Sequence, residues 1–572
     1  MLSPFTNMKH LLRWDLTHFR GDLFGGITAG IVAFPLALAF GAQTELGAIA
    51  GLYGAIALGV LAAMFGGTPT QISGPTAPMT VVSAVVIAKA IAFGGGIEEA
   101  MPLIVATFLL GGLIELLFGV IGAGRYIKYI PYPVVSGFMS GIGVIIIITQ
   151  IFPLLGAPSP AGGTLGVVMN LGRIPEIFNG YAVLLAAATI AIIYFFPKIT
   201  KSVPGSLIAL ILISGLAYVF LRDGQVSLIA DSTPGGVPKG LPKLQLSFWA
   251  ALIDPNNLAF IVQYGFTLAA LGAIDSLLTS VIADNLSKTK HDSNQELVGQ
   301  GLGNMAAALL GGLPGAGATM RTVINIQSGG RTRIAGVVAG LLLLAILLGL
   351  GPLVGNIPNA VLAGILLTVG IGIIDYKGFN HIRSIPRADA VIMLLVLAIT
   401  VFVGLLEAVA IGLILAALLF MKNIADVVEG RTLSAPLQTY AQELPWADED
   451  QDLLRQFGDL VFIKHLDGPL FFGFASRFQE IIRSKPHIQI VIIRMGRVPY
   501  VDQSGLYALE EAVSDLHAQN ITVAVTGLRG QPKDMLAGIN LVPGLVPAEL
   551  NFPTFQDCSV WLKQNLQNRI QS

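Results

Sequence analysis

The sequence predicts an all-α polytopic membrane domain of fourteen spans, built as a 7+7 inverted repeat and followed by a smaller α/β domain. Composition is the first reason, because 54% of the 572 residues are hydrophobic and 12% are charged, whereas a soluble domain has about 25% charged residues. Apolar runs recur from about residue 24 to 424, and after about residue 445 short apolar strands alternate with amphipathic helices. We expect a cytoplasmic N-terminal segment (1–20), a transmembrane domain (21–430) and a linker with a cytoplasmic domain (431–572).

The apolar runs are long enough to cross a bilayer, whose hydrocarbon core of about 30 Å needs roughly 20 helical residues. They are centred near residues 32, 55, 83, 110, 142, 189, 212, 270, 304, 326, 341, 363, 397 and 415. The N-terminus lacks the apolar core of a cleaved signal peptide. A single cysteine, Cys558, excludes an internal disulfide framework.

Loop charges predict the orientation of these spans. With an even number of spans and both termini in the cytoplasm, most loop Lys and Arg residues lie inside, in agreement with the positive-inside rule. The loop cations left outside are Lys89, Arg173, Arg222, Lys239 and Lys243. The polar loop 222–246 then separates two groups of seven spans. An odd-numbered unit and its copy must enter the membrane from opposite sides, which is the inverted repeat common in secondary transporters.

Two Gly-rich stretches interrupt helices at matching places in the two halves. They are "SGPTAPMT" (73–80) in the third span and "GAGATMRT" (315–322) in the tenth. Gly and Pro resist a continuous helix, and irregular backbone persists in lipid only when it is buried in protein or lines a wet cavity. If helices begin near Ala77 and Ala318, their free N–H groups favour an anion near mid-membrane. The alternative is that these small residues serve close helix packing.

Hydroxyl groups accompany both breaks, on Thr76 and Thr80 in the first and on Thr319 and Thr322 in the second. Each hydroxyl supplies one hydrogen-bond donor. The matched pair of breaks therefore favours a binding site over simple packing.

Asp275 lies in the middle of an apolar helix, "TLAALGAIDSLLTSVIAD" (267–284). An ionised group there costs about 2.5 to 3.5 kcal/mol or more. Thr279 lies one helical turn on and faces the same way, so a carboxylate, a hydroxyl and carbonyls of a broken helix form an oxygen site for a small cation. A proton on Asp275 would neutralise the charge equally well. The third alternative is a buried Asp bonded to hydroxyl groups of a neighbouring helix.

Two more charges fall within the membrane region. Glu115 in "LLGGLIELLFG" is isolated; pairing between helices is one interpretation, and the sequence assigns it no role. Arg321 lies in the first turn of the predicted tenth span, where the helix dipole opposes a cation. It either pairs with Glu115 or another carboxylate, lines the anion pathway, or points to solvent.

Four segments carry a resemblance to a known family. They are "GDLFGGITAGIVAFPLALAFG" (21–41), "FGGTPTQISGPTAPMT" (65–80), "AIDSLLTSVIADNLSKTKHDSNQELVGQGLGN" (273–304) and "GGLPGAGATMRTVINIQSGGRT" (311–332). In these segments the chain resembles the SulP sulfate-permease family of anion transporters, and within it the sodium-dependent bicarbonate transporters of cyanobacteria. The resemblance implies fourteen spans, divided into a core (spans 1 to 4 and 8 to 11) and a gate (5 to 7 and 12 to 14). It also implies a homodimer and transport by sliding of core against gate.

The resemblance also assigns site residues by position. The expected sodium ligands are Asp275, Thr279, Gly317, Ala318 and Thr319, with Na⁺ bound chiefly at Asp275, Thr279 and Thr319. The expected anion site lies beside Thr76, the start of the third-span helix at Ala77, and Ala318. Arg321 is added to this site from its position in the first turn of the tenth span, and it departs from the bicarbonate type. An Arg at position 321 is more similar to branches that handle chloride, oxalate or sulfate.

The C-terminal region resembles a STAS domain. "LVFIKHL", "IQIVIIRM" and "ITVAVTGL" indicate buried strands, and Leu506, Leu509, Val513 and Leu516 share one face of a predicted helix. In STAS relatives, the Ser of an Asp-x-Ser-Gly sequence at this helix start is phosphorylated, and Ser504 occupies that position here. The alternative interpretation of Ser504 is a helix cap.

These observations favour a Na⁺-coupled bicarbonate symporter in the plasma (inner) membrane, with no cofactor besides the co-transported Na⁺. The expected partners are a small inorganic anion, Na⁺, membrane lipid and a second copy of the chain, and no nucleic acid. The alternative within transport is a proton-coupled or exchanging carrier of sulfate, chloride or a dicarboxylate. A membrane-anchored STAS signalling protein is the alternative from another class, and no catalytic set of residues suggests an enzyme.

Overall fold

The computed structural model describes residues 16–160, 163–200, 204–221, 224–232, 242–431, 433–444, 455, 458–471 and 487–571. The chain divides into two compact units, Met1–Ile414 and Leu415–Ser572. Several residues used in the sequence predictions lie outside the described residues, namely 1–15 of the N-terminal segment, the loop cations Arg222 and Lys239, and 445–454 of the linker.

Each of the predicted span centres lies in a helix. These helices are α2 (Phe19–Ala42), α3 (Ala48–Phe65), α4 (Ala77–Gly94), α5 (Ile97–Val120), α6 (Tyr132–Thr149), α10 (Gly180–Phe195), α11 (Gly205–Phe220), α14 (Pro255–Ser287), α15 (Ser293–Leu309), α16 (Thr319–Gln327), α17 (Arg333–Val354), α18 (Asn359–Ile373), α20 (Arg387–Phe402) and α21 (Leu405–Arg431). Shorter helices lie between them: α7 (Ile151–Leu154), α8 (Gly163–Met169), α9 (Ile174–Ile177), α12 (Ile229–Ser232), α13 (Phe248–Ile253) and α19 (Tyr376–Asn380).

Within the described residues, eight helices are long and apolar enough to cross a membrane. Helix α16 has 9 residues, or about 14 Å of helix at 1.5 Å per residue, so it cannot cross the bilayer without the extended segment before it. The number of fourteen spans stays a prediction.

The helices of the first unit pack in two groups. Helices α2 to α5 pack mainly with α14 to α17, and α6, α10, α11, α18 and α20 pack mainly with one another. The first group has the membership expected of the core, and the second group contains the helices expected of the gate except α21. Every helix that carries a candidate transport-site residue belongs to the first group, so the candidate site lies within that group.

The two breaks lie side by side in the core. Strand β1 (Ser73–Gly74) precedes α4, strand β2 (Ala316–Gly317) precedes α16, and the two strands pair antiparallel. The Ala318 N–H also donates to the Ile72 carbonyl at 2.8 Å. An antiparallel pair is what a pseudo-two-fold axis between two inverted halves produces.

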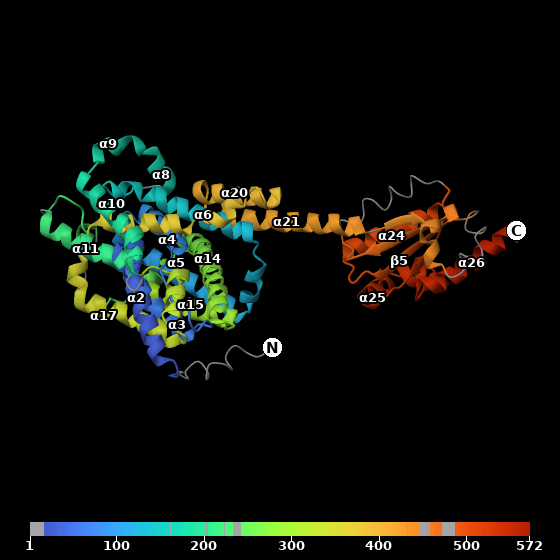
Figure 1. Cartoon of the computed structure of the whole chain (residues 1–572), viewed down its shortest axis with the longest axis horizontal. Helices are drawn as coiled ribbons and strands as arrows, with labels where there is room; N and C mark the ends of the chain where they lie inside the picture. The colour runs from blue at the N-terminus through green and yellow to red at the C-terminus, as the bar shows by residue number, and fades with distance from the viewer. Residues whose placement is uncertain are drawn as a thin grey trace. The chain divides into compact units, whose positions relative to one another are not determined.

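The second unit contains a five-stranded sheet in the order β3-β4-β5-β6-β7. Strand β3 (Leu433–Pro436) is antiparallel to β4 (Val461–Asp467), and β5 (Ile490–Arg497), β6 (Thr522–Thr526) and β7 (Asn551–Phe552) continue the sheet in parallel. The helices α24 (Gln503–Ala518), α25 (Gly530–Gly538) and α26 (Phe555–Gln571) complete the unit (Figure 1).

Side chains of β5 point alternately to the two faces of the sheet, and each face has its own hydrophobic core. Val491 and Ile493 face a core that includes α24, whereas Ile490 and Ile492 face a core with α26 and the segment Leu437–Glu443. Successive strand residues point to opposite faces, so a continuous apolar run is needed when both faces are covered. The predicted face of α24 is confirmed, because its Leu506, Leu509, Val513 and Leu516 are all buried.

Candidate functional site

Helix α14 contacts the second break through hydroxyl groups. The Thr279 hydroxyl donates to the Gly317 carbonyl at 2.9 Å and lies 2.8 Å from the Thr319 hydroxyl oxygen. The Gly317 N–H donates to the Ser276 hydroxyl at 3.1 Å. Two hydroxyl oxygens and a carbonyl oxygen therefore converge, and such oxygens are the ligands that small hard cations prefer.

The carboxyl group of Asp275 lies one turn before Thr279 on the same helix. Asp275 is 9% exposed, and its Oδ2 atom has no hydrogen-bond partner among the described residues. A buried carboxylate is stable only when it is paired or bonded to donors. The site thus contains a carboxyl oxygen that accepts no hydrogen bond, close in the helix to the hydroxyl and carbonyl oxygen atoms described above.

Arg321 connects the two breaks. It lies in the first turn of α16, is 2% exposed, and its Nη2 donates to the Pro75 carbonyl at 2.7 Å. Its Nη1 has no partner among the described residues and faces Gly74, where an added Cβ would lie 2.6 Å from it. Burial excludes the alternative in which Arg321 points to solvent. The described ion pairs include no pair with Glu115, and the charges of Arg321 and Asp275 attract each other.

The start of α4 leaves polar groups without partners. This helix begins at Ala77 after Thr76, as predicted, and Thr76 makes no side-chain cap. The hydroxyl groups of Thr76 and Thr80 are buried and make no hydrogen bond of good geometry in the part of the chain that the structure describes, although the Thr76 hydroxyl lies within reach of the Asp275 carboxyl group. The Thr322 hydroxyl, in contrast, accepts from the Ile72 N–H at 3.1 Å. Buried polar groups are rarely left unpaired without a reason such as an absent ion or ligand.

The second break starts a helix in the same way. Ala318 occupies the N-cap position of α16 and, like Thr76, has extended backbone and no side-chain cap. The helix starts near Ala77 and Ala318 thus agree with the sequence prediction. Each helix start leaves the N–H groups of its first turn, and the positive end of its dipole, at its break.

Residues that sequence reasoning missed hold the two breaks in place. The Glu296 carboxylate accepts from the N–H groups of Gly67 and Thr68 at 2.9 and 2.8 Å, and from the side-chain amides of Gln71 and Gln300 at 2.7 and 2.8 Å. Four donors satisfy this buried carboxylate and fasten the segment before the first break to α15.

Asn304 does the same for the second break. Its side chain accepts from the Gly315 N–H at 2.8 Å and donates to the Gly315 carbonyl at 3.0 Å. The available signal was the spacing of Glu296, Gln300 and Asn304, because polar residues four apart lie on one helix face and are out of place in an otherwise small and apolar helix.

In the second unit, Ser504 is exposed in the first turn of α24, and the cap is Asp502. The Asp502 carboxylate accepts from the Gly505 N–H at 2.7 Å. The interpretation of Ser504 as the helix cap is therefore wrong, since the aspartate two residues earlier occupies that role. Phosphorylation of Ser504 stays a prediction.

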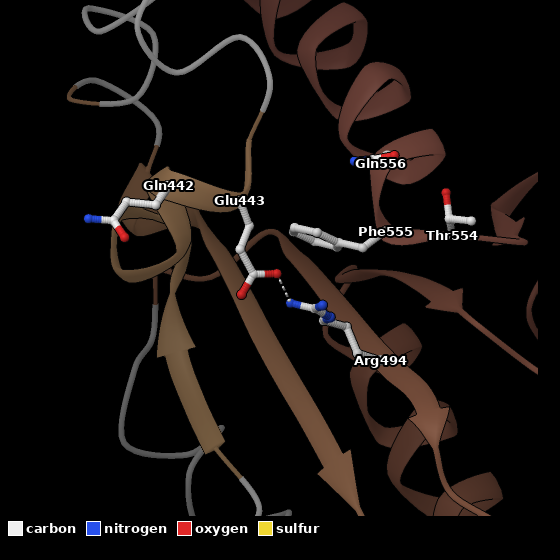
Figure 2. A pocket seen from close by; sticks show the side chains of 6 residues that line it. All are labelled: Gln442, Glu443, Arg494, Thr554, Phe555 and Gln556. Carbon is white, nitrogen blue, oxygen red and sulfur yellow. Dashed lines mark hydrogen bonds and ion pairs between the residues drawn. The ribbon is translucent and has the colours of Figure 1, made fainter.

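The second unit also has a polar pocket, lined by Gln442, Glu443, Arg494, Thr554, Phe555 and Gln556 (Figure 2). Arg494 donates to the Glu443 carboxylate at 2.7 Å and lies 4.3 Å from the centre of the Phe555 ring. The ion pair and the cation–π contact connect the segment Leu437–Glu443 to the sheet and to the start of α26.

Two helix starts without side-chain caps at paired breaks, near a buried acid and inside a bundle of apolar helices, are typical of a membrane transporter for a charged solute. The chain belongs to the sulfate permease family, whose model matches residues 19–396, and a STAS domain model matches residues 454–557. It is therefore an anion transporter and not an enzyme.

Relatives and solved structures agree with this assignment. The chain is 38% identical over 537 residues to the bicarbonate transporter BicA of Picosynechococcus sp., covering 93% of this chain and 92% of that protein. The transmembrane domain of a cyanobacterial BicA matches with a TM-score of 0.63 at 42% identity, over 69% of this chain and 98% of that domain. A murine Slc26a9 anion transporter in the inward-facing state matches in fold, with a TM-score of 0.80 at 17% identity over 98% of this chain and 93% of that one. The family and the fold class, a helical membrane domain followed by a STAS domain, are thereby confirmed.

Proposed function

We propose that this protein is a Na⁺-coupled bicarbonate symporter of the plasma membrane, in which one Na⁺ and one anion share the site between the two breaks. The observation that carries the proposal is the convergence of the Thr279 and Thr319 hydroxyl groups and the Gly317 carbonyl beside Asp275. The name of the similar Picosynechococcus protein, bicarbonate transporter BicA, supports bicarbonate as the anion.

Sodium binds on the α14 side of the site in this proposal. Asp275 supplies the negative charge, and Thr279, Gly317, Ala318 and Thr319 supply neutral oxygen atoms. The Thr279 hydroxyl now donates to the Gly317 carbonyl, and it rotates to present its lone pairs when Na⁺ enters. The unpaired Oδ2 of Asp275 fits such a ligand, because a bound cation removes the cost of burying the carboxylate.

The anion binds between the two helix starts. Its donors are the first-turn N–H groups of α4 and α16, the Thr76 hydroxyl and the free Nη1 of Arg321. The Ala318 N–H is not among them, because it donates to the Ile72 carbonyl. Each helix start contributes roughly half a positive charge. Na⁺ on Asp275 neutralises the acid that would otherwise repel the anion, so the cation binds first and prepares the anion site.

Both ions bind residues of the core, on α4, α14 and α16. A displacement of the core against the gate would carry both ions across the membrane together. A homodimer whose interface is formed by the gate would hold the gate still while the core moves. The orientation with both termini in the cytoplasm follows from the positive-inside bias of the loops and belongs to the same proposal.

The test is uptake of labelled bicarbonate by proteoliposomes under imposed Na⁺ and pH gradients. An inward Na⁺ gradient is expected to drive accumulation, and a pH gradient alone is not. Equal uptake with and without Na⁺ would contradict Na⁺ coupling.

Arg321 favours a second candidate, a carrier of sulfate, chloride or a dicarboxylate coupled to protons or to exchange. A guanidinium is a permanent charge, and its attraction to Asp275 offers that acid a counter-ion within the protein. Sulfate or chloride flux that is insensitive to Na⁺ and lost in Arg321→Gly would support this candidate in the same vesicles.

A further inference from the structure

Glu115 is a buried acid that plays no part in the proposed ion site. It lies on α5, is 1% exposed, and its Oε2 accepts from the Asn304 side-chain amide at 2.7 Å. Its Oε1 has no partner among the described residues and lies against α14, where a Cβ added to Gly272 would be 3.1 Å away. The carboxyl group is thus enclosed between α5, α14 and α15 with one donor.

Glu296 provides an internal comparison in the same helix bundle. Both acids are 1% exposed, but the Glu296 carboxylate accepts four hydrogen bonds and Glu115 accepts one. A carboxylate can accept about four hydrogen bonds, whereas the protonated acid needs fewer and carries no charge. The surroundings of Glu296 suit the ionised form, and those of Glu115 suit the acid.

The orientation of Asn304 leaves Glu115 no second donor. Asn304 makes two hydrogen bonds with Gly315, and these bonds fix its oxygen toward the Gly315 N–H and its nitrogen toward the Gly315 carbonyl. The same nitrogen also donates to Glu115. One amide group therefore serves both Glu115 and the second break.

The charges that act on Glu115 also favour the neutral acid. They belong to Asp275 on α14 and Glu296 on α15, and both are negative. Among the cations whose side chains the structure describes on the other packed elements, Lys89 of α4 donates to the Tyr264 hydroxyl and Arg125 lies over the Tyr126 ring. Like charges disfavour ionisation of a carboxyl group.

We propose that Glu115 is a proton-binding site, occupied when the two breaks are paired, and that release of its proton at alkaline pH slows transport. An ionised Glu115 attracts the Asn304 amide, which weakens the bond from Asn304 to the Gly315 carbonyl and loosens the second break. The proton passes to water and none is transported in the cycle, so the inference goes beyond the proposed symport.

Infrared spectroscopy of the purified full-length protein tests the occupied site without any transported solute. At neutral pH the wild-type protein is expected to have a carboxylic-acid C=O band that is missing from Glu115→Gln and fades at alkaline pH. Glu407→Gln is the matched control, because Glu407 is an exposed acid in the first turn of α21, and this variant should keep the band. A wild-type spectrum without a Glu115-dependent band would overturn the proposal, whatever anion the protein carries.

Transport then tests the consequence. Glu115→Gln mimics the protonated acid, so it should transport at the wild-type rate at neutral pH and lose the decline at alkaline pH. Glu115→Ala, which cannot position Asn304, should lose activity at both pH values. A folded Glu115→Gln protein that is inactive, or that keeps the wild-type pH profile, would contradict a proton on Glu115.

Discussion

The hydroxyl oxygen atoms of Thr279 and Thr319 lie 2.8 Å apart, and this contact joins the helix that carries the buried acid to the start of α16. Thr279 is fully buried and also donates to the Gly317 carbonyl. These oxygens lie near Asp275 and the second break together, so in the proposed function a cation bound on α14 would fix the position of the helix end that binds the anion. That relation is the physical basis of the proposed coupling.

Thr279→Val should weaken Na⁺ binding and leave the fold intact. Valine keeps the shape and removes one oxygen ligand, for which a loss of about 1 to 1.5 kcal/mol, or roughly five- to tenfold in the Na⁺ concentration for half-maximal uptake, is expected. The measurement is bicarbonate uptake at varied Na⁺. Thr267→Val is the control. Among the described contacts, the hydroxyl of Thr267 donates a hydrogen bond only to the Gln263 carbonyl, one turn earlier in the same helix. Equal Na⁺ dependence in both variants would exclude Thr279 as a ligand.

Arg321→Gln should weaken anion binding more than Na⁺ binding. The substitution removes a buried charge-assisted donor, worth about 1.5 to 3 kcal/mol, so the half-saturating anion concentration should rise at least tenfold. Anion titrations at saturating Na⁺ measure this effect. The exposed Arg173 provides a charge-loss control in Arg173→Gln. If Arg321→Gln instead leaves anion affinity unchanged and alters only the Na⁺ requirement, Arg321 serves as the counter-ion of Asp275.

Gly315→Ala should disrupt the pairing of the breaks. A Cβ at this position would collide with the Gly74 carbonyl and with the Pro75 nitrogen, which are backbone atoms that cannot rotate away. Overpacking of this kind costs about 1 to 3 kcal/mol, and uptake should fall by more than tenfold. In α18, a Cβ on Gly372 meets nothing within 4 Å, so Gly372→Ala should retain activity. Normal transport by Gly315→Ala would mean that the pairing of β1 and β2 is dispensable.

Much of the fold could be predicted from the sequence, because lipid imposes a simple rule. Backbone groups in hydrocarbon must bond within a helix, so long apolar runs predict helices and Gly/Pro-rich runs predict breaks. The start of α4 at Ala77 and the start of α16 after Ala318 follow from that rule. Asp275 and Thr279 stood out for the same reason, since polar groups are costly in an apolar helix.

Contacts between distant segments could not be predicted in this way. Ser73 and Gly317 are paired across the two halves. No local sequence pattern specifies a strand pairing between residues so far apart in the chain. The hydrogen bonds from the backbone N–H groups of Gly67 and Thr68 to the Glu296 carboxylate likewise join residues more than 200 positions apart in the sequence. The spacing of Glu296, Gln300 and Asn304 predicts a polar face on α15, but it does not identify the groups that this face binds.

The buried thiol of Cys558 should make the stability of the second unit depend on pH. Burial raises the pKa of its thiol from 9.0 to about 12, although Arg494 acts in the opposite direction. Above about pH 9 the unfolded chain loses the thiol proton and the folded domain keeps it, so the free energy of unfolding should fall as pH rises, by about 1.4 kcal/mol per pH unit.

Urea unfolding of the full-length protein, followed by tryptophan fluorescence, measures this effect. The comparison with Cys558→Ala removes the contribution of other alkaline groups, and the difference in unfolding free energy between the two proteins should shrink from about pH 9 toward pH 12. A constant difference over that range would show that the buried thiol makes no contribution.

Asp275→Asn is the most direct test of the coupling of Na⁺ to the anion. The amide has the same shape without the charge, so the folded variant should lose Na⁺-driven accumulation of labelled bicarbonate in proteoliposomes while retaining its assembly in the membrane. A folded Asp275→Asn protein with the wild-type dependence of uptake on Na⁺ would place the cation elsewhere and contradict the account.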